Sequence, residues 1–159
     1  MYELGLWQAN EDRGVKEVTM GEVMERLGEA INSHDLDDFV ALFATDYRSD
    51  QPAHPLRWFE GADKVRDNWT SVFAGVPDLT AKLLAAATTD GGVEMGEWDW
   101  HGTYVDGSRF AMRGVIVLGV EGGCIVWGRL YMEPVEENGG DIDEMVRETY
   151  RPPDGSAHT

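Results

Sequence analysis

The sequence predicts an α+β domain in which a long, curved antiparallel sheet wraps around three helices from the N-terminal half. Apolar residues recur at helical spacing in the first half of the chain, and strand-like runs separated by glycine-containing turns follow from Thr80 onward. These runs are roughly ten residues long, against the usual five or six, which favours strong curvature. We therefore expect a cone with the helices on its concave face and a pocket at its mouth.

The three helices are predicted from apolar spacing and from their capping residues. A T-x-x-E pattern starting at Thr19 has the form of a capping box for the first helix. Asp35 follows that helix and caps a second, shorter one, whose apolar stripe extends to Phe43. A third helix is predicted over 62–74, with Gly75 as its stop.

The predicted strands form a four-stranded meander. Their turns are "TDGG" at 89–92, "VDGS" at 105–108 and "EGG" at 121–123, the kind of loop that joins neighbouring antiparallel strands. Residues 18–135 then form one domain, preceded by a loose arm over 1–17. An acidic tail over 136–159 follows, with a short helix expected at 141–149.

Composition restricts the partners. The chain has 159 residues, 42% of them hydrophobic, and thirteen Lys and Arg against thirty Asp and Glu, for a formal charge of −17. That charge repels nucleic acid and anionic membranes, so we expect neither as a partner. Neither a run of about 20 apolar residues nor a signal-peptide pattern is found, which favours a cytoplasmic location. Cys124, the single cysteine, is expected to be a buried thiol.

The stretch "GEWDWHG", residues 96–102, is the main candidate site. In a strand, Glu97, Asp99 and His101 share one face and Trp98 and Trp100 share the other. Either the polar face is solvated and the tryptophans fill the core, or Asp99 faces a pocket and the tryptophans lie at an interface. Glu97 and Asp99 inside a pocket could divide acid and base roles.

Metal binding is not expected at this strand. Glu97 and His101 are separated by about 13 Å along a strand, whereas metal ligands lie about 2 Å from the ion. The sequence also contains neither an H-E-x-x-H motif nor a cysteine cluster. We expect no metal and no cofactor.

Further candidates come from "QPAHPLRWF" and from two other segments. His54 lies between two prolines, which hold its backbone rigid and suit either an acid/base role or a solvent-facing loop. Trp58 could cover the mouth of the pocket or pack beneath this loop, and Trp69 could form a wall of the pocket. Arg113, if it points inward, could stabilise an enolate.

The ordered motifs "HDLDDFVALFATDYRSDQP", "FEGADKVRDNW", "EWDWHGTYVDG", "MRGVIV" and "GGCIVWGRLYMEP" resemble the nuclear transport factor 2-like superfamily, in particular its SnoaL-like branch. The resemblance covers residues 18–135. It implies a conical, cystatin-like α+β barrel with a ligand cavity between sheet and helices. It also implies a homodimer that packs through the outer face of the sheet.

The resemblance carries over only some functional positions. Ketosteroid isomerase-like members have a carboxylate base before a proline, and Gln51 occupies that position here, so this base is lost unless Asp50 turns inward. Epoxide-hydrolase-like members have an Arg-x-Asp pair that here reads Glu97-x-Asp99, and their second Asp falls on Leu130. An epoxide hydrolase of that type is therefore disfavoured.

Strand parity carried over from the family places Asp99, Leu130 and Met132 in the cavity and leaves Arg129 and Tyr131 outside. The resulting hypothesis is a cofactor-independent cyclase or isomerase acting next to a carbonyl of a small organic ligand. Asp99 would be the base, with His54 or His101 as its proton partner. The alternatives are a non-catalytic ligand-binding or interaction module on the same fold, and an epoxide-hydrolase-like enzyme.

Overall fold

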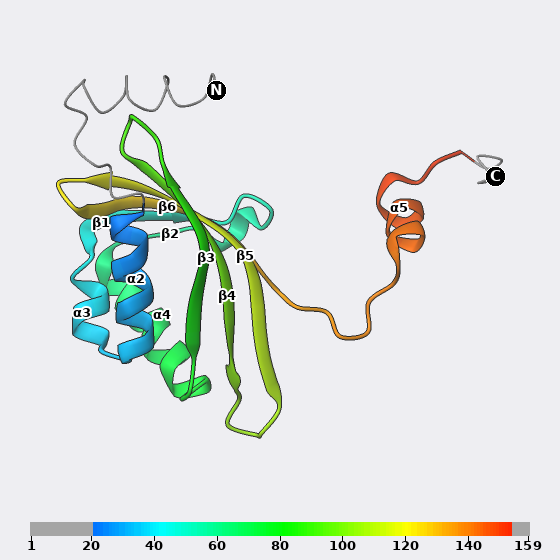
Figure 1. Ribbon diagram of the computed structural model, residues 1–159, viewed down its shortest axis with the longest axis horizontal. Helices are drawn as coiled ribbons and strands as arrows, with labels where there is room; N and C mark the ends of the chain where they lie inside the picture. Colours follow the sequence, from blue (N-terminus) through cyan, green and yellow to red (C-terminus); the bar gives the residue numbers. More distant parts are fainter. Residues whose placement is uncertain (1–20, 154–159) are drawn as a thin grey trace, which may run out of the picture.

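Figure 1 shows the computed structural model, which describes residues 21–153. The expected arm over 1–17 and the cap at Thr19 lie outside the described residues. The helices are α2 (Glu22–Ser33), α3 (Leu36–Val40), α4 (Ala62–Gly75) and α5 (Ile142–Tyr150), with one 3-10 turn, η1 (Pro55–Arg57). The strands are β1 (Phe43–Asp50), β2 (Phe59–Glu60), β3 (Thr80–Thr88), β4 (Val93–Thr103), β5 (Arg109–Glu121) and β6 (Cys124–Pro134).

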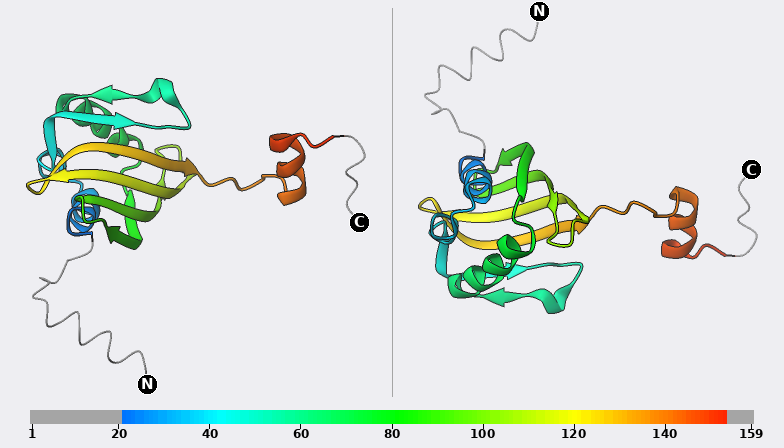
Figure 2. Two further views of the ribbon diagram at one scale, coloured as in Figure 1. Left: turned by 90° about the horizontal axis from the view of Figure 1, so that it is seen from above. Right: turned by 90° about the horizontal axis from the view of Figure 1, so that it is seen from below.

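The strands form one curved sheet in the order β2-β1-β6-β5-β4-β3. β3 to β6 make the predicted antiparallel meander, while β1 joins it parallel to β6 and β2 pairs antiparallel with β1. Figure 2 shows helices α2 and α4 on one face of the sheet, and α2 packs mainly against β3 and β4. The expected α+β fold with helices inside the curve is confirmed.

Strand β1 is a correction to the sequence analysis, which placed Phe43 in a helical stripe. Helix α3 ends at Val40, and Phe43 begins a strand that reads "FATDYRSD". Within β1 the buried Tyr47 and Ser49 alternate with the exposed Arg48. Only one apolar side chain, Tyr47, is buried in this alternation, so the strand periodicity is weak in the sequence.

The first turn of α2 donates hydrogen bonds to a side chain of the sheet. Its N-cap is Gly21, with φ +79° and no capping side chain. Instead, the carboxylate of Glu94, a buried residue on β4, accepts hydrogen bonds from the backbone N–H groups of Val23 at 3.2 Å and Met24 at 3.0 Å. A negative charge at a helix N-terminus is favourable. This contact therefore ties α2 to the sheet across seventy residues of sequence.

The tryptophans of β4 face the helices, which corrects the expected inward orientation of Asp99. Trp98 is fully buried and Trp100 is 6% exposed. Gly28 lets α2 come close, since a Cβ there would lie 3.0 Å from Cη2 of Trp98. The two faces of a strand alternate, so only one set can be buried. Burying two large indoles stabilises the fold more than burying charges that would need partners.

Two smaller predictions have different outcomes. Asp35 caps α3 as predicted, because its Oδ1 accepts a hydrogen bond from the N–H of Asp38 at 3.0 Å. Cys124 is half-buried rather than fully buried, because it sits at the first position of β6, beside the exposed turn that joins β5 to β6.

The C-terminal helix α5 forms where a short helix was expected. Its N-cap Asp141 accepts a hydrogen bond from the N–H of Glu144 at 2.9 Å, and none of its residues is buried. Figure 1 shows α5 standing clear of the sheet and of the other helices. Within residues 21–153, none of the helices combines the length and apolar character needed to cross a membrane.

Candidate functional site

A largely apolar pocket of about 210 Å³ lies between the concave face of the sheet and helices α2 and α4. It is bounded by five strands, β1, β2, β4, β5 and β6, so the curvature of the sheet creates it. The lining residues are Leu27, Ile31, Phe39, Phe43, Tyr47, Ser49, Gln51, Phe59, Val65, Asn68, Trp69, Val72, Trp100, Ile116, Leu118 and Leu130.

The polar groups of the pocket come mainly from β1 and the residue after it. Tyr47, Ser49 and Gln51 alternate along this segment and all face the pocket. Burial raises the pKa of Tyr47 to about 12, although a hydrogen bond with Ser49 lowers it. Tyr47 is therefore a neutral phenol that can donate a hydrogen bond at neutral pH. The fourth polar residue, Asn68, extends from α4.

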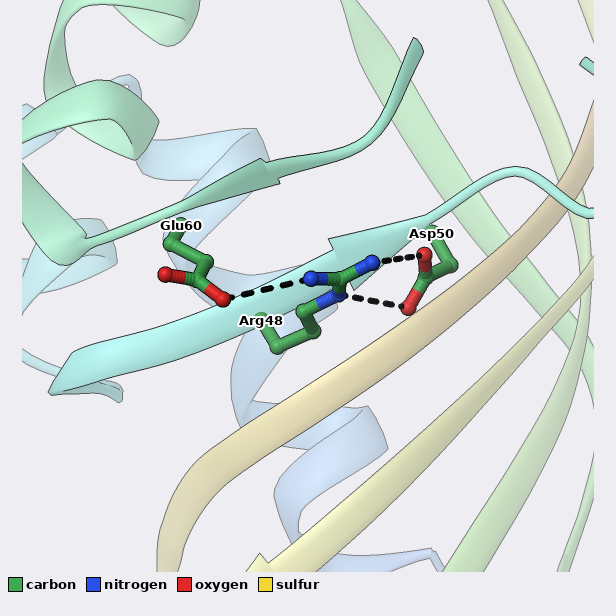
Figure 3. A network of polar contacts seen from close by, with 3 residues as sticks. All are labelled: Arg48, Asp50 and Glu60. Atoms are coloured by element: carbon green, nitrogen blue, oxygen red, sulfur yellow. Dashed lines mark hydrogen bonds and ion pairs between the residues drawn. The ribbon is translucent and has the colours of Figure 1, made fainter. Parts of the chain in front are cut away.

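The side-chain amide of Gln51 is oriented by Arg57. Its Oε1 accepts a hydrogen bond from Nη1 of Arg57 at 3.1 Å. An amide cannot act as a general base, and its neighbour Asp50 does not replace it. Asp50 belongs to a polar network outside the pocket, shown in Figure 3.

In this network Arg48 donates from Nε and Nη2 to the two carboxylate oxygens of Asp50, both at 3.1 Å, and from Nη1 to Glu60 at 3.2 Å. The hydrogen bonds from Arg48 lower the pKa of the Asp50 carboxyl. Asp50 is thus held as a carboxylate by a partner on the outer side of β1. It does not line the pocket, so the inward Asp50 considered from the sequence is ruled out.

The acidic candidates of β4 lie on the outer face of the sheet. Glu97 and His101 are exposed, and Asp99 pairs through Oδ2 with Nη2 of Arg113 at 2.9 Å. The Arg113 side chain is 63% exposed. The cavity orientation expected for these four residues is therefore wrong, because the buried tryptophans fix the parity of the strand.

The 51–58 loop contributes less than expected. His54 lies 2.7 Å from Glu133, from its Nε2 to Oε1, and both side chains are well exposed. Trp58 is half exposed and stacks on the Arg48 guanidinium, with 4.6 Å between Cζ and the ring centre. Neither His54 nor Trp58 lines the pocket, and neither do the residues that they contact, Glu133 and Arg48.

Three of the predicted ligand-binding residues, Gln51, Trp69 and Leu130, do meet at the pocket. Met132 is buried at 5% exposure, but it does not reach the lining. Tyr47, Ser49 and Asn68 were not predicted from the sequence as pocket residues. For the first two, the alternation of "YRSDQ" around a strand that ends at the Gln51-Pro52 dipeptide was the available signal.

The pocket-lining residues that the structure describes include no Asp, Glu, His, Lys or Arg. Tyr47 is the one side chain among them that titrates in the ordinary range of protein acids and bases, and its pKa lies far above neutrality. Across residues 21–153 there is also no group of three or more His, Cys, Asp and Glu arranged to hold a metal ion.

A curved six-stranded sheet with helices and an apolar pocket on its concave side is the architecture of nuclear transport factor 2-like proteins. The model of the SnoaL-like domain family matches residues 24–127, which is more than half of the chain. The chain belongs to this family. A search of curated proteins gave no significant match.

Solved structures share the fold at low sequence identity. Wild-type IdmH, a putative polyketide cyclase from Streptomyces antibioticus, superposes with a TM-score of 0.61 at 23% identity, over 71% of this chain and 91% of that one. RV0760c from Mycobacterium tuberculosis, solved in complex with estradiol-17beta-hemisuccinate, superposes with a TM-score of 0.61 at 18% identity, over 69% of this chain and 89% of that one. A hypothetical protein from Catenulispora acidiphila with a ketosteroid isomerase-like fold was solved in complex with trimethylamine. It superposes with a TM-score of 0.61 at 17% identity, over 70% of this chain and 85% of that one.

Proposed function

We propose that this chain binds a small, neutral, largely apolar organic molecule in the pocket without transforming it. The observation that carries the proposal is the lining, in which the described residues offer aromatic and aliphatic surface and neutral hydrogen-bonding groups. A volume of about 210 Å³ is below the range of about 300–1,000 Å³ for drug-sized ligands. The ligand is therefore small, comparable to one or two fused rings.

An acid/base cyclase or isomerase is supported less well by the same geometry. Proton abstraction next to a carbonyl needs a base within hydrogen-bond reach of the substrate. The expected base Asp99 is paired with Arg113 on the opposite face of β4, and Gln51 cannot accept a proton in that role. An epoxide hydrolase would need a carboxylate in the pocket, and the described lining supplies none.

Binding can be tested with a neutral probe and its anionic analogue, 2-methylnaphthalene and 2-naphthoate, by titration calorimetry. We expect the neutral probe to bind at least about tenfold more tightly. A buried carboxylate without a partner is costly, and the formal charge of −17 repels anions. Equal affinity for the two probes would contradict the proposal.

The location is tested by a matched pair of variants on α4. Asn68 lines the pocket and its neighbour Asp67 is exposed on the outer side of the helix. Asn68→Phe should fill part of the pocket and weaken binding of 2-methylnaphthalene at least about tenfold, whereas Asp67→Phe should leave the affinity unchanged. If Asn68→Phe binds as the wild type does, the probe occupies another site.

We also propose that the outer face of the sheet pairs with a second copy of the chain. Met95, Val115 and Tyr131 lie on neighbouring strands of the outer face and are 37–44% exposed, which forms a small apolar patch beside the exposed Glu97, the cross-strand partner of Val115. The next row of the sheet holds Asp99 and Arg113, with opposite charges. In a two-fold interface the same surface of each subunit meets its copy. Asp99 of one subunit can then pair with Arg113 of the other.

Sedimentation equilibrium tests this interface. We expect the wild type to be a dimer at micromolar concentration and Val115→Glu to be a monomer, because the new carboxylate would be buried in the interface directly beside that of Glu97. Val105→Glu makes the same chemical change in the exposed turn between β4 and β5 and should remain dimeric. A monomeric wild type would refute the interface.

A further inference from the structure

Gln51 carries a hydrogen-bond donor that is free in the described part of the chain. Its Oε1 accepts a hydrogen bond from Nη1 of Arg57 at 3.1 Å, whereas its Nε2 contacts no acceptor among the described residues. Arginine can only donate, so the amide oxygen faces Arg57 and the amide nitrogen faces away from it. The buried side-chain N and O atoms without a partner in this part of the chain are Nε1 of Trp98 and Nε1 of Trp100. Nε2 of Gln51 is not one of them, so it is accessible.

The accessible nitrogen of Gln51 lies on the pocket side of its amide. Gln51 continues the alternation of Tyr47 and Ser49 on the inner face of β1, and like them it lines the pocket. Arg57 is exposed and lies outside the lining. The oxygen and the nitrogen of a carboxamide project to opposite sides of its carbon atom. Since the oxygen is directed toward the exposed Arg57, the nitrogen is directed toward the pocket.

The surroundings of this donor determine the kind of acceptor that fits it. The guanidinium of Arg57 polarises the amide through its oxygen, which strengthens the N–H groups as donors. Most of the lining is apolar and includes Phe59, Trp69 and Leu130. An anionic acceptor would lose its hydration among these side chains, and the formal charge of −17 also repels it. A neutral oxygen loses less on entering the pocket and can still accept from the amide.

We infer that Gln51 is a specificity-determining residue whose Nε2–H donates a hydrogen bond to a neutral oxygen of the ligand, such as a ketone or ester oxygen. This role rests on the proposed binding function and deepens it. Arg57 is the positioning residue, because it holds the amide oxygen and leaves the nitrogen available. The ligand then has an apolar body with an oxygen acceptor at the end of the pocket where β1 ends.

The test uses two probes of the same ring skeleton, 1-tetralone, which carries a carbonyl oxygen, and tetralin, which does not. The affinity ratio of tetralone to tetralin is measured by calorimetry for the wild type and for Gln51→Met, which keeps the length of the side chain and removes the donor. We expect this ratio to fall at least about fivefold in Gln51→Met. His54→Met introduces the same residue into the same loop, outside the pocket lining, and should leave the ratio unchanged.

The positioning role of Arg57 is tested with the same affinity ratio. Arg57→Met should lower the ratio about two- to threefold, because the amide of Gln51 is then neither held nor polarised. Arg57→Lys keeps a cationic donor and should restore most of the ratio. If the ratio stays at the wild-type value in Arg57→Met, Arg57 does not position the amide.

A second measurement needs no variant. In a spectrum of the ¹⁵N-labelled wild type, with the side-chain NH₂ resonances assigned through bonds, tetralone should shift a Gln51 resonance downfield relative to tetralin.

The assignment to Gln51 is overturned if both probes bind but the ratio is unchanged in Gln51→Met, or if the Gln51 resonances respond equally to both probes. It is also overturned if the ratio falls only in Asn68→Leu, which removes the other carboxamide of the lining. In each of these cases the binding pocket itself stands. If neither probe binds the wild type at all, the proposed binding function fails, and the role of Gln51 fails with it.

Discussion

Replacing Trp98 with alanine should lower the free energy of unfolding by about 3–5 kcal/mol, the range for truncating a large buried aromatic side chain. Trp98 is fully buried, lies directly over Gly28 of α2 and packs edge-on against Trp100. No small movement of α2 can fill the space, because that helix is also held by the hydrogen bonds between its first turn and Glu94. Chemical denaturation followed by far-ultraviolet circular dichroism measures the loss.

The matched control is the next residue along the strand. Asp99→Ala removes only an exposed ion pair with Arg113, and such pairs contribute about 0–1 kcal/mol. The difference between the two losses in unfolding free energy therefore shows which face of β4 points into the protein. If Asp99→Ala were the more destabilising substitution, the orientation of the strand and the placement of the pocket would both be wrong.

The parity of β4 also marks the limit of the sequence analysis. The alternation in "GEWDWHG" predicted a strand and defined its two faces. It could not choose between them, because a tryptophan face suits both a core and an interface. The family parity pointed to Asp99, and the structure resolves the choice through Gly28, whose missing side chain leaves room for Trp98 on a helix seventy residues away.

A pocket between the sheet and the helices was predicted from the sequence, but only some of its lining residues were. Trp69 and Leu130 were expected from the helical stripe and from strand parity, and both line it. Tyr47 and Ser49 were missed because β1 pairs in parallel with the last strand of the chain, a long-range pairing that leaves little local trace. The short-range rules that found the meander depend on turns between adjacent strands. No such turn joins β1 to β6.

The capping of α2 shows the same limitation for a single residue. A capping box is a local pattern, and it selects Thr19, which lies outside the described residues. The acceptor that the structure provides is Glu94, which lies on a strand where its neighbours Met95 and Glu97 are exposed. Glu94 is an ordinary charged residue in the sequence, and only the packing of α2 against β4 makes it a buried one.

Glu94→Ala should therefore destabilise the protein by about 2–4 kcal/mol. Hydrogen bonds to a charged acceptor contribute about 1.5–3 kcal/mol each, and two that share one carboxylate are not fully additive. The substitution leaves the N–H groups of Val23 and Met24 without their acceptor. Glu94→Gln retains one carbonyl oxygen but removes the charge, so it should lose about half as much.

Glu97→Ala is the control, since Glu97 is exposed on the same strand and its removal should change stability by no more than about 0.5 kcal/mol. Hydrogen exchange locates the effect, because the amides of Val23 and Met24 should exchange faster in Glu94→Ala even under native conditions. Their unchanged protection, together with wild-type stability, would show that α2 does not depend on Glu94. Loss of protection confined to the start of α2 would instead establish Glu94 as the contact that fixes this helix over the sheet, and hence fixes one wall of the pocket.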